Sequence, residues 1–219
     1  MKRDVILAIE TANAGGSLSL LRKGFEIDFW AGEDKISRAE DLHTNISSLL
    51  SKNLLDKSEI KGISICTGPG SFTGVRVGIA TSKGLQKALG CECKGVSMLE
   101  AMVLKTKDKG TVITGFSSGK TDICWQSFET DGRNDILEKT SPKITRISEF
   151  ALHLREFAEK TLILPCDLIE KISKTDFNLK EFNLIEFNEN PAKYIGLRSE
   201  QINSSTEILP IYARDARIS

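Results

Sequence analysis

One glycine-rich run of the sequence combines residue types that bind phosphate in many proteins. Residues 67–78 read Thr-Gly-Pro-Gly-Ser-Phe-Thr-Gly-Val-Arg-Val-Gly and follow an apolar run. A turn of this kind between a strand and a helix can present backbone amides at a helix N-terminus, where an anion binds. Gly68 and Gly70 are the candidate residues. The run lacks the GxxxxGK(S/T) pattern of a P-loop, and Lys83 lies too far into the helix to replace its lysine, so a plain tight turn explains the run equally well.

The helix expected after this turn carries small residues on one face. Gly74, Gly78 and Ser82 are spaced by four residues, so they line one side of the helix. Each interior glycine costs about 1 kcal/mol of helix stability relative to alanine. Small residues on one face allow a neighbour to approach closely. That neighbour is either the preceding helix of the same chain or a helix of another subunit, and the sequence leaves both alternatives open.

Few other residues are candidates for binding a metal ion or a nucleotide. Glu10 and Thr11 end the first apolar run, and His43 lies in a helical pattern. The second histidine, His153, is distant in sequence, and neither histidine belongs to an HxxxH or HExxH motif. The five cysteines contain a CxC pair but no CxxC. We therefore expect no metal site, no cofactor and no disulfide framework.

The apolar pattern predicts a mixed α/β fold. Three short strands separated by turn residues come first, as in an antiparallel meander, and helices then alternate with strands. An S-x-x-E capping box at residues 37–40 is expected to begin the first helix. The expected strands are 5–9, 17–21, 25–31, 62–66, 94–96, 111–115, 123–128, 162–164 and 184–187, and the expected later helices are 74–89, 99–105, 148–160 and 192–202.

Composition excludes several classes of protein. The 219 residues include 30 Lys plus Arg and 30 Asp plus Glu, so the formal net charge is 0. Because phosphate affinity comes mainly from clustered basic side chains, such a chain does not bind nucleic acid or an acidic membrane by bulk charge. Any RNA binding needs a partner or a local patch. No apolar run approaches the roughly 18 residues of a membrane span, and the run at 5–9 is too short for a signal peptide, so we expect a cytoplasmic protein.

Four stretches closely resemble one protein family. They are residues 6–11, the helix around His43, the glycine-rich run 68–78 and residues 95–101. These stretches resemble the bacterial tRNA threonylcarbamoyladenosine biosynthesis proteins called TsaB or YeaZ-like, over about the first half of the chain. The resemblance implies an α/β fold with two lobes, of the actin-like (ASKHA, ribonuclease H-like) type, in which helices flank mixed sheets.

The same resemblance implies a function and partners. Members of this family are noncatalytic subunits of the complex that forms threonylcarbamoyladenosine at position 37 of tRNA. Their partner is a paralogous transferase, TsaD, which carries the metal and the chemistry, and an ATPase, TsaE, completes the assembly. We therefore expect the chain to bind and activate a TsaD-like subunit and to meet tRNA only through the complex. The isolated chain is expected to form a homodimer through the same surface.

The resemblance also implies a partner interface on the helices before and after the glycine-rich turn. The residues expected there are Leu42, His43, Ile46, Gly74, Val75, Gly78, Ser82 and Leu85. A vestigial nucleotide site would use Glu10, Thr11, Gly68 and Gly70.

Two departures from the family weaken the case for that nucleotide site. Glu10-Thr11-Ala12 replaces the usual Asp-Thr-Ser, and Ser117-Ser118 with the following glycine replaces the usual Asp-Ala-Arg. Mg²⁺ requires well-placed carboxylate oxygens, which these changes remove or displace.

The lobes are expected to divide at a polar stretch near residue 107. Residues 1–107 would form the first lobe, joined by the tail 206–219, and residues 108–205 would form a more divergent second lobe.

The alternative function is that of an actin-like-superfamily enzyme acting on its own, either a nucleotide hydrolase or a metal-dependent carbamoyl transferase. Such an enzyme would depend on Glu10, Thr11, His43 and the Gly68–Gly70 turn, yet no two of these form a recognisable acid–base or metal motif. A peptidase is disfavoured, because Ser71 is not in a G-x-S-x-G context.

Overall fold

The computed structural model describes residues 3–32, 41–118, 121–133, 135–154, 160–175, 177–202 and 208–211. The capping box expected at residues 37–40 lies outside these residues. The chain forms two compact units, of which the first comprises Met1–Ala101 with Asn190–Tyr212 and the second contains Met102–Glu189. The boundaries thus fall after residues 101 and 189, whereas the sequence suggested residues 107 and 205.

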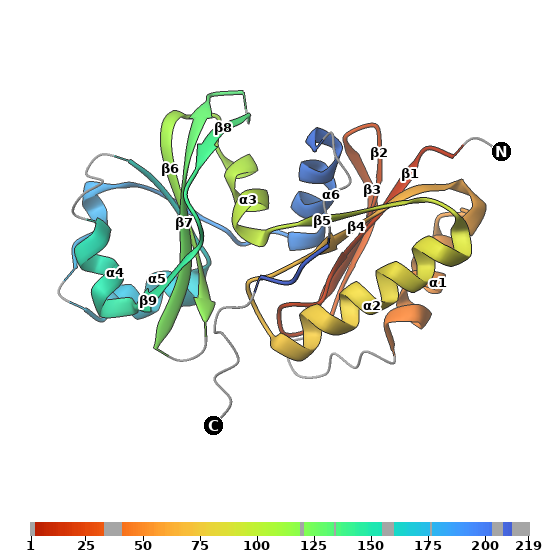
Figure 1. Cartoon of the computed structure of the whole chain (residues 1–219), viewed down its shortest axis with the longest axis horizontal. Coiled ribbons are helices and arrows are strands. Elements are labelled where there is room, and N and C mark those ends of the chain that lie inside the picture. The colour runs from red at the N-terminus through yellow and green to blue at the C-terminus, as the bar shows by residue number, and fades with distance from the viewer. Residues whose placement is uncertain are drawn as a thin grey trace. The chain divides into compact units, whose positions relative to one another are not determined.

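The first unit is built on a five-stranded mixed sheet. The strands are β1 (Val5–Glu10), β2 (Ser17–Arg22), β3 (Phe25–Ala31), β4 (Ile60–Cys66) and β5 (Glu92–Val96). Their order is β3-β2-β1-β4-β5 (Figure 1). Strand β2 is antiparallel to its neighbours β1 and β3, and β4 is parallel to both β1 and β5. The expected meander is therefore confirmed, and the central strands β1 and β4 place their carboxyl ends side by side.

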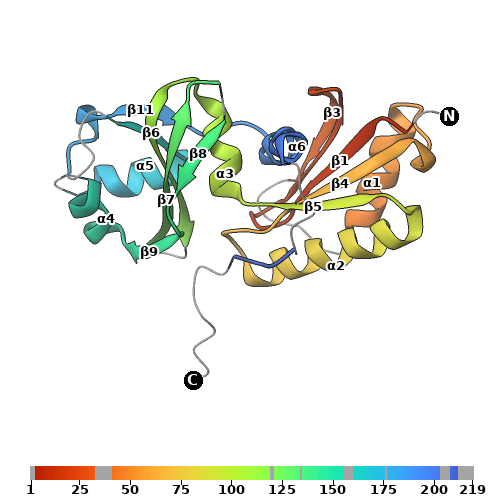
Figure 2. The ribbon, with the colours of Figure 1, turned by 45° about the horizontal axis from the view of Figure 1, so that its top comes forward.

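Helices cover both faces of this sheet. Helices α1 (Asp41–Lys52) and α2 (Phe72–Leu89) lie on one face and α6 (Pro191–Gln201) lies on the other (Figure 2). Helix α6 buries Ala192 against Ile6, Ala8 and Leu21 of β1 and β2. This packing explains why α6 belongs to the first unit, although the sequence analysis assigned residues 192–202 to the second lobe.

Helix α2 has clear start and stop signals. The Ser71 hydroxyl accepts a hydrogen bond from the Gly74 amide at 3.2 Å, as an N-cap does. Gly90 ends the helix in the left-handed region with φ of +58°, where glycine carries no Cβ penalty. The short elements η1 (Lys57–Glu59), α3 (Met98–Met102) and η2 (Val103–Lys105) connect the remaining parts.

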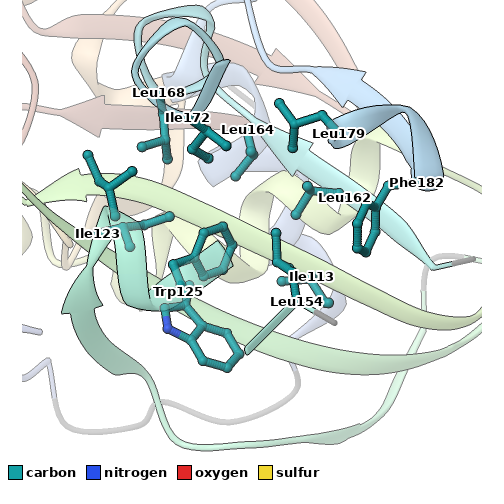
Figure 3. Packing of buried hydrophobic residues seen from close by; sticks show 12 residues of the cluster. Ile113, Ile123, Trp125, Leu154, Leu162, Leu164, Leu168, Ile172, Leu179 and Phe182 are labelled. Carbon is teal, nitrogen blue, oxygen red and sulfur yellow. The ribbon is translucent and has the colours of Figure 1, made fainter. Parts of the chain in front are cut away.

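The second unit contains a six-stranded sheet of order β11-β10-β6-β7-β8, with β9 also pairing with β7. The elements are β6 (Lys109–Ser118), β7 (Asp122–Asp131), β8 (Ile136–Lys139), β9 (Lys143–Arg146), α4 (Ile147–Leu154), β10 (Thr161–Leu164), α5 (Cys166–Ser173), η4 (Leu179–Glu181) and β11 (Asn183–Glu186). Its core packs α4 and α5 against the sheet around Trp125, which contacts Phe150 with ring centroids 5.5 Å apart (Figure 3). The sequence analysis missed α5 and the short strands β8 and β9.

Candidate functional site

The glycine-rich loop lies at the carboxyl end of β4, next to the end of β1. Backbone hydrogen bonds fix it to other segments of the first unit. The Ser71 amide donates to the Ala12 carbonyl at 2.7 Å, and the Thr67 amide donates to the Val96 carbonyl at 2.9 Å. The Met98 amide donates to the Gly68 carbonyl at 2.8 Å, and the Ile211 amide donates to the Thr67 carbonyl at 2.7 Å. Thr67 and Gly68 are buried. The loop is therefore held by the protein's own backbone on several sides.

The loop glycines provide room for neighbouring backbone. Gly68 has φ of +103°, and a Cβ added to it would lie 2.7 Å from the Ile211 carbonyl oxygen. Gly70 has φ of +153°, and its added Cβ would lie 2.5 Å from the Ala12 carbonyl oxygen. Both positions require glycine for conformation and for space. The plain structural explanation of the run thus accounts for Gly68 and Gly70 without a bound phosphate.

Glu10 ends β1 as a buried acidic side chain, 1% exposed. Its Oε1 accepts hydrogen bonds from the amides of Ala12 at 2.5 Å and Asn13 at 2.8 Å. The Oε2 atom is buried without a hydrogen-bond partner among the described residues. Burial raises the pKa of Glu10 to about 7, and the two amide bonds oppose that rise. The carboxyl group thus binds the amides of its own β1–β2 turn.

Thr11 connects the end of β1 to helix α2. Its hydroxyl donates to the Gly74 carbonyl at 2.8 Å. A Cβ added to Gly74 would collide with the Thr11 carbonyl oxygen, and one added to Gly78 would collide with the Thr11 hydroxyl and lie 2.8 Å from Cδ1 of Ile65. The small face of α2 therefore packs on β1 and β4 of the same unit. Among the described residues, the nearest neighbours of Gly74 and Gly78 outside their own helix are thus Thr11, Ser71 and Ile65, and not the preceding helix.

Most of the residues expected at a partner interface point into the first unit. Five are buried, two are half-buried and one is exposed. The buried ones are Leu42, Ile46, Val75, Gly78 and Ser82, the half-buried ones are Gly74 and Leu85, and the exposed one is His43. Buried side chains hold the helices on the sheet, so a partner would meet the opposite faces of these helices.

The outward face of α2 carries a second row of small residues, which sequence reasoning missed. Ala80, Gly84 and Ala88 share the four-residue spacing of the inner row and are exposed. A Cβ added to Gly84 meets no atom within 4 Å. The signal was present in the sequence, since the same periodicity that marked Gly74, Gly78 and Ser82 marks these residues about 120° around the helix.

The remaining candidates do not form a metal site. Among the described residues, no group of three or more His, Cys, Asp or Glu side chains could hold a metal ion. The cysteines are free thiols. Ser117, one of the departures from the family pattern, donates to Asp167 at 2.7 Å and accepts from Lys171 at 3.1 Å. Lys171 also pairs with Asp167 at 3.0 Å, so these three side chains form a closed polar network in the second unit.

The helices of the described part of the chain are each too short or too polar to cross a membrane.

The two units, each a sheet flanked by helices, define an actin-like α/β protein. Two solved structures from Pseudomonas aeruginosa share the fold. One is described as an uncharacterized protein similar to peptidase YeaZ, with a TM-score of 0.72, 18% identity and coverage of 96% of this chain and 100% of that one. The other is described as YeaZ, with a TM-score of 0.68, 17% identity and coverage of 95% and 99%.

Sequence comparison identifies the family. The sequence model of the family described as "TsaD: tRNA N6-adenosine threonylcarbamoyltransferase" matches residues 36–205, more than three quarters of the chain, and the chain belongs to this family. Within it, the chain is similar to the Bacillus subtilis tRNA threonylcarbamoyladenosine biosynthesis protein TsaB, with 32% identity over 138 residues, 63% of this chain and 59% of that one.

The matches cover between 35% and 59% of the length of these curated relatives. The TsaB of Escherichia coli is 31% identical over 136 residues, 58% of this chain and 55% of that protein. An uncharacterized protein of Mycobacterium leprae is 29% identical over 128 residues, 57% of this chain but 35% of its own length. These matches confirm the TsaB and YeaZ resemblance found in the sequence.

Proposed function

We propose that the chain is a noncatalytic subunit of the machinery that forms threonylcarbamoyladenosine in tRNA, and that it binds and activates a TsaD-like relative. Membership of the family and similarity to two proteins named TsaB support the pathway. The end of β1 and the glycine-rich loop support the noncatalytic part of the proposal. Glu10 binds the amides of its own turn, and Gly68 and Gly70 are packed against backbone, so contacts within the chain account for these candidate residues.

The outward face of helix α2 is the surface that we propose for the partner. Its row Ala80, Gly84 and Ala88 leaves open space over the helix backbone, which allows a helix of a related fold to approach closely. His43 on α1 is exposed and was part of the interface expected from the sequence. A second copy of this chain can use the same surface in an isologous homodimer, and we expect a TsaE-like ATPase and tRNA to join only through the complex.

The binding proposal is tested with the purified chain and the TsaD-like protein of the same source. Gly84→Leu places a bulky side chain on the open face, and overpacking of this type costs typically about 1–3 kcal/mol at an interface. We expect the affinity for the partner to fall about tenfold to a hundredfold in calorimetry. The matched control is Lys174→Leu, an exposed position of the second unit, which should leave affinity unchanged. Equal affinities of the Gly84 variant and the wild type would exclude this face.

The noncatalytic role is tested in cells that depend on this gene. Depletion of the chain should lower threonylcarbamoyladenosine in digested tRNA, measured by mass spectrometry. Glu10→Gln keeps an oxygen for the Ala12 and Asn13 amides but removes the acid and its negative charge. We expect this variant to restore the modification fully. Loss of the modification with a stably folded Glu10 variant would instead support the enzyme alternative.

A further inference from the structure

Residues 208–211 lie beside the glycine-rich loop. The Ile211 amide donates to the Thr67 carbonyl at 2.7 Å. The Ile208 side chain is 8% exposed, whereas the neighbouring Leu209 is 60% exposed. A segment that buries one side chain, exposes the next and bonds to main chain has features of a recurrent mode of peptide recognition. The segment is thus bound by one buried side chain and one backbone hydrogen bond.

Two glycines make the room that this segment occupies. A Cβ added to Gly95 on β5 would lie 3.2 Å from Cγ2 of Ile208 and 2.8 Å from Cγ2 of Thr67. A Cβ added to Gly68 would lie 2.7 Å from the Ile211 carbonyl oxygen. Gly95 lies on β5, and Gly68 lies in the glycine-rich loop. The atoms nearest to their added Cβ positions belong to Ile208, to Ile211 or to Thr67. The two glycines therefore allow close approach of this segment at Ile208 and at Ile211.

We propose that Thr67, Gly68 and Gly95 form a peptide-binding site whose ligand is the chain's own C-terminal segment, and that this segment is a releasable strap on the loop that begins helix α2. The loop connects the segment to the helix directly, since Thr67 and Gly68 stand four and three residues before Ser71, the N-cap of α2. Release leaves the buried Thr67 carbonyl without its donor and opens the space beside Gly95, so the loop and the first turn of α2 lose support.

The strap also gives the protein a way to regulate partner binding, an extension that rests on the function proposed above. Helix α2 begins at the strapped loop and carries the outward row with Gly84. A released strap frays the first turn of the helix and lowers affinity for whatever docks along it. A partner that binds the ordered helix therefore favours the strapped state, because a ligand shifts a conformational equilibrium by its differential affinity.

Hydrogen exchange on the full chain tests the strap itself. Ile211→Pro removes the donated N–H, and Gly95→Ala places a methyl group against Ile208 and Thr67. We expect the exchange rates of the Ser71, Met98 and Val75 amides to rise at least about tenfold in both variants, with the second-unit strands unchanged. Gly62→Ala on β4, whose added Cβ lies 3.6 Å from its nearest neighbour, is the matched control and should change nothing. Unchanged exchange at the loop in both variants would overturn the strap.

A peptide supplied in trans tests the binding site. The peptide Glu-Ile-Leu-Pro-Ile-Tyr, residues 207–212, should bind the Ile211→Pro chain and not the wild type, because a tethered segment acts at an effective concentration of about millimolar. A peptide with Asp in place of the residue at position 208 should not bind. Binding to wild type and variant alike, or to neither at millimolar peptide, would refute the site. Partner affinity is measured separately, so a wild-type chain that binds no TsaD-like partner would refute the proposed function and leave the peptide result standing.

Discussion

The two rows of small residues on helix α2 have the same spacing and opposite surroundings. The inner row, Gly74, Gly78 and Ser82, packs against the end of β1 and against β4, and Thr11 fills the space beside both glycines. The outer row, with Gly84 at its centre, faces open space. Small residues at helical spacing thus indicate close approach without indicating what approaches. In this chain the sheet explains the inner row, and the outer row is exposed.

Gly78→Leu should give the largest effect on stability. Even a Cβ at this position collides with the Thr11 hydroxyl, so a leucine must displace β1 or α2. Overpacking of this severity costs about 3 kcal/mol, or roughly 6–12 °C in Tm for a protein of this size. The same leucine at Gly84 is the control, and calorimetry should show little loss of Tm there. Comparable losses at the two positions would remove the distinction between the rows.

Glu10 should make the stability of the first unit depend on pH. Its pKa is raised from 4.5 to about 7 in the folded protein, so the native state holds this proton more tightly than the unfolded chain does. The resulting stability is full below pH 4.5, falls as the pH rises toward 7 and is lost above it, a change of about 3 kcal/mol. Denaturant titrations between pH 4 and 8 measure this slope.

Glu10→Gln provides the control for that pH dependence. The glutamine oxygen can still accept from the Ala12 and Asn13 amides, but no proton is exchanged. The variant should lack the decline between pH 4.5 and 7, whereas Glu92→Gln at an exposed position should keep it. An identical slope in the Glu10 variant and the wild type would assign the decline to other groups.

Thr11→Val should give a smaller loss that tests the contact of the inner row directly. Valine keeps the volume of threonine but cannot donate to the Gly74 carbonyl. Losing one hydrogen bond of this kind costs about 1 kcal/mol, or roughly 2–4 °C in Tm. Thr44→Val on the exposed side of α1 should leave Tm within about 1 °C. A Thr11 variant as stable as the wild type would mean that the hydroxyl does not hold α2 on β1.

The sequence predicted the elements that have both a clear apolar pattern and clear turn residues at their ends. The meander β1–β3, the strand β4 and helix α2 follow from short apolar runs bounded by turn residues, although α2 begins at Phe72 and not at the expected residue 74. Strands β8 and β9 are four residues long with mostly exposed side chains, so they carry no apolar period. Helix α6 was recognised as a helix, but its place on β1 and β2 depends on long-range packing against Leu21, which no local pattern encodes.

The sequence predicted which residues form the candidate site but not how their side chains are arranged. Glu10, Thr11, Gly68 and Gly70 were all selected from sequence, and the structure brings them to adjacent ends of β1 and β4. The sequence could not show that the Glu10 carboxyl group turns back onto its own amides, because a carboxylate at a strand end can equally face solvent or a ligand. Nor could it place residues 208–211 against Thr67, a contact between segments about 140 positions apart.

Gly84→Ala should give the smallest effect, and its sign separates the outer row from the inner one. An alanine methyl at this exposed position contacts nothing within 4 Å, so the substitution removes the backbone-entropy cost of glycine without strain. A gain of up to about 1 kcal/mol, or roughly 2–4 °C in Tm, is expected from helix propensity alone. Gly78→Ala, whose methyl meets Thr11, should lower Tm despite the same gain in propensity. Calorimetry on this matched pair measures the two opposite shifts, and a fall in Tm for Gly84→Ala would mean that the outer face is already covered within the protein.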